Sequence, residues 1–230
     1  MVNVHKYLIL IFALPAILIE SCSSNLYEIA YVAKTTFPEK AEFNGDWRRE
    51  STELNFSLDG INIKVRPAIS LSSRSGTIFF IESTRTPFTH ESNFNYISVG
   101  LYSKNAGALI SDISGVLNQT DSNYTVKPDV VYYANQQGRI ISFMNSSEFI
   151  LRNTNSIPIR QQDNFYGIKR WTKNEKVPAM SCFQFIYPTT MVIDSNTIYK
   201  MKIGKLKMPD GREQVLEIYL MPSFLRYEGH

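Results

Sequence analysis

The stretch "ELNFSLDGINIKVR", residues 53–66, is the strongest indication of the fold in this sequence. Its dipeptide Asp59-Gly60 suits a two-residue type I′ turn, in which both residues need positive φ. Folding about this turn places three apolar pairs on one face: Leu58 with Ile61, Phe56 with Ile63 and Leu54 with Val65. The other face then carries three polar pairs: Ser57 with Asn62, Asn55 with Lys64 and Glu53 with Arg66. Because the turn and both faces agree, the stretch predicts an antiparallel hairpin.

A second hairpin is predicted near the end of the chain, in "IYKMKIGKLKMPDGREQVLEIYLMP", residues 198–222. Pro209-Asp210-Gly211 supplies its turn. Before the turn, apolar residues alternate with lysines, and this alternation changes phase at Gly204. A β-bulge at Gly204 restores a single apolar face, formed by Tyr199, Met201, Ile203, Leu206 and Met208.

Short strand-forming segments separated by polar turns occupy much of the remaining chain. The predicted strands are residues 77–82, 96–102, 129–134, 139–144, 148–152 and 181–187. The segment 129–134 is expected to pair with 139–144, and "SLSSRSG", residues 70–76, is interpreted as a turn. Only "NAGALISDISGVL", residues 105–117, repeats apolar residues at helical intervals. The predicted fold class is all-β, an antiparallel β-sandwich with at most one short helix.

The composition suits a single domain of this class. The 230 residues carry 24 basic and 21 acidic side chains, a formal net charge of +3, which does not favour nucleic acid as a partner. Two cysteines, Cys22 and Cys182, are too few for a disulfide scaffold. Residues 26–230 can bury a substantial core, and we expect one domain rather than two.

The first 21 residues have the organisation of an export signal. Lys6 precedes an uncharged apolar run at residues 7–19, and polar residues follow from Glu20. This run is shorter than the roughly 20 residues that cross a bilayer, and Pro15 disfavours a permanent helix. Residues 1–21 are therefore interpreted as a signal peptide outside the fold.

The end of this signal resembles the lipobox of bacterial lipoproteins. The segment is Ile19-Glu20-Ser21-Cys22. Its branched Ile19, small Ser21 and Cys22 match the lipobox pattern, whereas Glu20 departs from it. The resemblance implies a diacylglycerol on Cys22, a short lipid-anchored tether at residues 22–25, and the membrane as a partner through this lipid. In that family a serine after the modified cysteine, here Ser23, implies sorting to the outer membrane of a diderm bacterium.

Other interpretations of this segment stay open. Ser21 and Ser23 also fit a small-x-small cleavage site that would release a soluble exported protein, and an uncleaved anchor is a third possibility. The alternative role for Cys22 is a disulfide with Cys182, since exported proteins do use disulfides. If Cys22 is lipidated, Cys182 in "AMSCFQFIY" is expected to be a small buried side chain.

The sequence lacks most motifs that mark enzymes. His90 is the only histidine apart from His5 in the signal and His230 at the end, so histidine clusters for zinc are excluded. Neither a phosphate-binding glycine motif nor a calcium loop occurs, and no cofactor or metal is expected. Two kinds of catalytic site are defined by distances in space and not by sequence spacing: a nucleophile–base pair of Cys182 with His90, and two carboxylates for glycoside hydrolysis.

Candidate binding residues gather in residues 152–180, a long span with little strand patterning. Its six basic and two acidic side chains give a net charge of +4, more than the +3 of the entire chain. A long irregular segment often serves binding, and basic residues beside aromatic rings suit an anionic glycan or lipid headgroup. The candidates are Arg160, Tyr166, Lys169, Arg170, Trp171 and Lys173, together with Trp47 in "NGDWRRE". A solvated loop is the alternative.

The sequence thus predicts a non-enzymatic envelope lipoprotein that binds an anionic glycan, a lipid headgroup or another envelope protein at the membrane surface. The alternative prediction is an exported carbohydrate-active hydrolase with Asp or Glu catalysts. A hydrolase needs two carboxylates that face one cleft, one of them with a raised pKa. A binding module needs an aromatic or basic patch.

Overall fold

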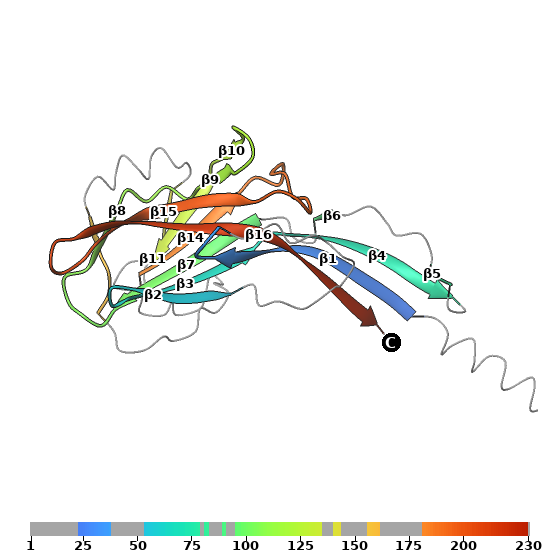
Figure 1. Cartoon of the computed structure of the whole chain (residues 1–230), viewed down its shortest axis with the longest axis horizontal. Helices are drawn as coiled ribbons and strands as arrows, with labels where there is room; N and C mark the ends of the chain where they lie inside the picture. Colours follow the sequence, from blue (N-terminus) through green and yellow to red (C-terminus); the bar gives the residue numbers. More distant parts are fainter. Residues whose placement is uncertain are drawn as a thin grey trace, which may run out of the picture.

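The computed structural model consists of two β-sheets packed face to face, from which one sheet extends (Figure 1). The structure describes residues 23–37, 53–78, 81–82, 89–90, 95–134, 140–143, 156–161 and 181–229. Every regular element in these ranges is a strand, and the named strands pair antiparallel. The predicted fold class, an all-β antiparallel sandwich, is therefore confirmed. Within the same ranges, no helix is long and apolar enough to cross a membrane.

The first sheet has ten strands. Seven of them follow one another in hydrogen-bonding order: β10 (Thr125–Val126), β9 (Val116–Gln119), β15 (Tyr199–Lys207), β16 (Glu213–Gly229), β1 (Ser23–Lys34), β4 (Ser70–Ile78) and β5 (Ile81–Glu82). The other three pair beside this path: β8 (Leu109–Ser111) with β15, β13 (Ile157–Pro158) with β8, and β6 (Thr89–His90) with β4.

The second sheet has six strands, and the core lies between it and the first sheet. Its order is β12 (Ile140–Phe143), β11 (Val130–Ala134), β14 (Ser181–Tyr187), β7 (Asn95–Ser103), β3 (Ile61–Ala68) and β2 (Leu54–Leu58). Met201 and Ile218 of the first sheet and Ile63 and Val99 of the second are each fully buried in one hydrophobic cluster.

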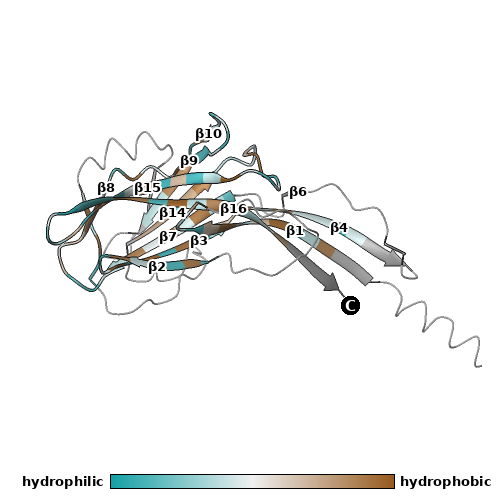
Figure 2. Ribbon diagram, in the orientation of Figure 1, coloured by the Kyte–Doolittle hydropathy of each residue, from teal (hydrophilic) through white to brown (hydrophobic). Residues whose placement is uncertain are grey.

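The first predicted hairpin forms with the expected register. Leu54 lies opposite Val65, and Leu58 lies opposite Ile61. Asp59 and Gly60 have φ values of 46° and 84°, as a type I′ turn requires. Hydrophobic and hydrophilic residues alternate along β2 and β3 (Figure 2). Alternation and turn chemistry therefore determine this hairpin.

The second predicted hairpin also forms, and its bulge is where the sequence placed it. The register between β15 and β16 shifts between Lys202 and Gly204. A Cβ atom on Gly204 would lie 2.8 Å from the backbone oxygen of Ser111, so only glycine fits without a shift of the backbone. At the turn, the N–H of Gly211 donates to the carbonyl of Met208 at 2.9 Å. All five residues of the predicted apolar face are buried.

The predicted helix at residues 105–117 is wrong. This segment forms β8 and the start of β9, both of which pair with β15. Gly107, Asp112 and Gly115 have positive φ values of 89°, 50° and 62°, which end any helical run. A Cβ atom on Gly115 would lie 2.2 Å from the Phe185 ring. The apolar spacing arises because two short strands, separated by this turn, both direct side chains into the core.

The segment from 70 to 82 also differs from its prediction. Residues 70–76, interpreted as a turn, belong to β4, and residues 77–82 are not one strand, because β4 ends at Ile78 and β5 pairs back on it. Ser72 and Ser73 point to opposite faces, and both are buried. A strand with small polar residues covered on both faces lacks the alternation by which strands are recognised. The predicted strand at 148–152 lies outside the described residues.

The extension of the first sheet is a three-stranded ribbon of β16, β1 and β4 (Figure 1). Residues 213–220 of β16 pair with β15, and residues 219–229 pair with β1. Residues 23–25, which the sequence analysis assigned to a tether, are the first residues of β1: Ser24 lies opposite both Gly76 and Gly229. The chain therefore enters the ribbon directly after Cys22.

Candidate functional site

Most of the residues that the sequence analysis proposed as functional lie outside the described part of the structure. These are Cys22, Trp47, Tyr166, Lys169, Arg170, Trp171 and Lys173. Arg160 is described. The structure therefore leaves the lipidation residue and most of residues 152–180, which we call the basic segment, as predictions. It describes residues 156–161 of this segment and Ser181, which follows it.

Arg160 lies at the edge of the sandwich beside the end of β7. Its carbonyl accepts a hydrogen bond of 3.0 Å from the N–H of Ser103. The next residue, Gln161, forms an isolated bridge with Ser103, and its Nε2 donates to the carbonyl of Lys104 at 3.2 Å. Backbone hydrogen bonds to the end of β7 thus fix the position of Arg160.

The described residues on either side of residues 162–180 meet the same end of β7. Gln161 pairs with Ser103, and Ser181, the first residue of β14, lies opposite Leu101. The chain between them therefore leaves and re-enters the described structure at one end of the sandwich. The tip of the first hairpin lies at this end, because the N–H of Lys104 donates to the carbonyl of Gly60.

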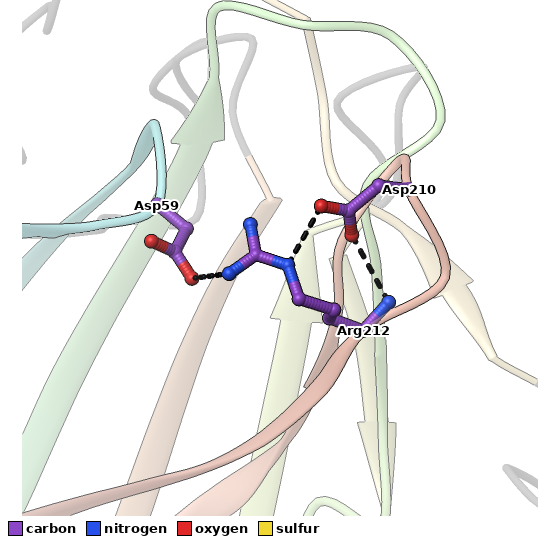
Figure 3. Close-up of polar contacts among 3 residues, drawn as sticks. All are labelled: Asp59, Asp210 and Arg212. Atoms are coloured by element: carbon purple, nitrogen blue, oxygen red, sulfur yellow. Dashed lines mark hydrogen bonds and ion pairs between the residues drawn. The ribbon is translucent and has the colours of Figure 1, made fainter.

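The tips of the two predicted hairpins, one from each sheet, are joined there by Arg212 (Figure 3). Its Nη1 lies 3.2 Å from Oδ2 of Asp59, and its Nε donates to Oδ2 of Asp210 at 2.7 Å. Backbone and side-chain hydrogen bonds from Arg212 lower the pKa of Asp210, and Asp210 raises the pKa of Arg212. All three side chains are well exposed, so the network adds little stability.

The described carboxyl groups whose pKa clearly departs from the ordinary value do not have the shift that a general acid needs. Three carboxyl groups have clearly shifted pKa values, namely Glu53, Asp210 and Glu213, and all three shift downward. For Glu53, burial raises the pKa, but hydrogen bonds from Lys64 and Asn55 outweigh it. A glycosidase acid requires the opposite shift, so none of these three groups fits that role.

Cys182 is a free cysteine buried in the core, as expected for a small apolar side chain. Burial raises the pKa of its thiol to about 12, so it stays protonated at neutral pH. Cys182 lies on β14 of the second sheet, whereas His90 lies on β6 and pairs with Leu71 of the first sheet. The structure therefore does not support a Cys182–His90 nucleophile. No group of three potential metal ligands occurs within the described ranges.

A basic surface that the sequence analysis did not propose lies on the outer face of β15. Because Tyr199, Met201, Ile203, Leu206 and Met208 point into the core, the residues between them point outward. They include four lysines, which we call the lysine face: Lys200, Lys202, Lys205 and Lys207. The bulge at Gly204 keeps all four on one side. The change of phase in the lysine spacing was the signal that could have revealed this surface.

No protein-family model, no curated protein and no solved structure matches the chain.

Proposed function

We propose that this chain is a non-enzymatic binding module of the bacterial cell envelope, held at the outer membrane by a diacylglycerol on Cys22. The observation that carries the proposal is the position of β1. This strand begins at Ser23, and its N-terminal end lies at the far end of the ribbon (Figure 1). A lipid on Cys22 would therefore be attached to the tip of a paired strand rather than to a flexible tether.

The two ends of the molecule then have different roles. The ribbon end carries the anchor, and the hairpin tips, with Arg212, lie at the opposite end of the sandwich (Figure 1). Residues 162–180 begin and end beside these tips, at Gln161 and Ser181. The basic and aromatic residues of this segment supply the charge and ring surface that an anionic glycan or lipid headgroup requires.

The anchor is tested by mass spectrometry of the protein purified from membranes. The expected result is an N-terminal Cys22 that carries a lipid adduct. Cys22→Ala should prevent processing and release the protein from the membrane fraction, because stable anchoring depends on the acyl chains. An unmodified N-terminus at Ser24 in the parent protein would contradict the proposal.

The binding role is tested on the basic segment itself. Replacement of Lys169, Arg170 and Trp171 together with Ser should weaken binding to anionic liposomes and cell-wall polysaccharide, and should flatten its dependence on salt. Unchanged binding in a folded variant would remove this segment as the site and leave Trp47 as the next candidate of the sequence analysis.

A further inference from the structure

We propose that the lysine face, together with Phe37 and Tyr219, is a surface for an anionic polysaccharide. This inference rests on the proposed binding role, and it adds a second site on a different part of the molecule. Four features support it: lysines without ion pairs, the spacing of the lysines, an adjoining aromatic pair and the direction in which the lysine face runs.

The first feature is that two of the four lysines form no ion pair within the described residues. Lys202 lies directly opposite Glu217 in the register, yet Glu217 forms its ion pair with Lys200, at 2.7 Å. At the other end of the strand, Glu213 lies opposite Lys207 but pairs with Lys205. Within the described ranges, neither Lys202 nor Lys207 has an ion pair, although Lys207 helps to lower the pKa of Glu213. Four lysines against Glu213, Glu217 and Asp112, whose charge also acts on Lys205, leave these groups with a net charge of four minus three, or +1.

The second feature is the regular arrangement of these charges. Lysines two residues apart on a strand are separated by about 6.6 Å, and the pairs 200/202 and 205/207 repeat this spacing on either side of the bulge. The face is a line of cations along one strand. Such a line is complementary to an extended polymer with regularly spaced anionic groups, and less so to a single small anion.

The third feature is an aromatic pair at one end of this line. Tyr219 lies opposite Lys200 in the register, and the Phe37 ring packs edge-on against it, with ring centroids 5.4 Å apart. Phe37 is 53% exposed, which is unusual for phenylalanine in a folded chain. An exposed ring offers an apolar face on which a sugar can stack, and this favours a polysaccharide over a polyanion without rings.

The fourth feature is the direction in which the lysine face runs. β15 leads to the turn with β16, at the end of the molecule opposite the start of β1 (Figure 1). With the proposed lipid at the start of β1, the lysine face extends away from the anchoring membrane. Polysaccharide outside that membrane, rather than its own lipid headgroups, is therefore the partner that this placement favours.

The test compares matched charge variants of the full-length protein in detergent. Lys202→Gln/Lys207→Gln removes the two lysines without ion pairs, and Arg66→Gln/Lys127→Gln removes two exposed basic residues elsewhere. The probes are polygalacturonate as an anionic polysaccharide, neutral dextran, polyglutamate and phosphatidylglycerol vesicles. Affinity is measured by titration calorimetry at low and high salt, and thermal melting checks that each variant is folded.

We expect the parent to bind polygalacturonate and not dextran. The 202/207 variant should bind on the order of tenfold more weakly with a flatter salt dependence, and the 66/127 variant should bind like the parent. Phe37→Ser should weaken binding to polygalacturonate more than to polyglutamate, because only the former presents a sugar ring.

Three results would overturn the inference. Equal losses of affinity in the 202/207 and 66/127 variants would mean that only net charge matters. Loss of binding in the 169/170/171 variant alone would leave the proposed binding role intact and assign it to the basic segment. Binding to phosphatidylglycerol vesicles that depends on Lys202 and Lys207, without binding to polygalacturonate, would assign the lysine face to lipid. None of these results affects the proposed lipid on Cys22, which has its own test.

Discussion

The two faces of β15 carry alternate residues of one strand and differ in what they contact. On the inner face, Tyr199, Met201 and Leu206 are fully buried in the core between the sheets. On the outer face, Lys200 and Lys205 pair with glutamates in contact with solvent. The inner face is constrained by packing, whereas the outer face is free to vary without loss of the fold. A dense set of charges on a free face is therefore a better indication of function than an apolar inner face.

The largest difference in stability is expected between substitutions at two neighbouring residues of β15, one on each face. Leu206→Ala should destabilise the protein by about 2–5 kcal/mol, because it leaves a cavity between the sheets. Lys207→Ala, one residue further along the same strand, should change stability by less than about 0.5 kcal/mol. Urea denaturation of both variants measures the difference. Similar losses in the two variants would mean that the two faces are not assigned correctly.

A smaller effect is expected at the bulge that keeps the two faces separate. Gly204→Val should cost about 1–3 kcal/mol, because its Cβ would press on the Ser111 carbonyl and the Ile110 side chain. Lys202→Val introduces the same side chain on the outer face and serves as the control. The melting temperatures of the two variants are compared by thermal unfolding. Equal melting temperatures would mean that β8 does not approach Gly204 of β15 as closely as described.

The smallest effect concerns the ion pairs of the outer face. The hydrogen bond from Lys205, followed by its charge, lowers the pKa of Glu213. Any stability that this shift provides is present above the unfolded pKa of a glutamate and is lost as the pH falls through the lower folded pKa. Lys205→Gln should therefore raise the pKa of Glu213 in an NMR titration, and any difference in melting temperature from the parent should vanish once the pH lies below the folded pKa of Glu213.

Lys202→Gln is the control for this titration, because Lys202 has no ion pair with Glu213 in the described structure. It should leave the pKa of Glu213 close to its parent value. An equal change in both variants would show that the overall charge of the face, rather than the contact with Lys205, sets this pKa.

Local sequence patterns were sufficient for the hairpins and insufficient for the ribbon. Asp59-Gly60 and Pro209-Asp210-Gly211 specify turns between strands that are adjacent in the sequence, so their registers could be derived residue by residue. The ribbon instead pairs β1 with β16, from opposite ends of the chain, and no local pattern encodes that contact. Its third strand, β4, was missed because its serines are buried on both faces.

The candidate site was predictable to a smaller extent. The charge excess of residues 152–180 is visible in the sequence, but only residues 156–161 of this span, which include Arg160, are described, so the role of Lys169 and Trp171 stays a prediction. The lysine face depends on which side chains of β15 point outward and on the diagonal pairing of Glu213 and Glu217. Such pairing is a property of the folded sheet and cannot be read from composition.

The position of β1 in the ribbon also has a mechanical consequence. A pull on the chain at the start of β1, resisted by the sandwich, acts along the strand axis, whereas the hydrogen bonds to β4 and β16 are perpendicular to it. The load is then in shear, and the bonds on both sides of β1 carry it together rather than opening one after another. Placed between two antiparallel neighbours, the first strand is suited to bear tension from whatever holds the N-terminus.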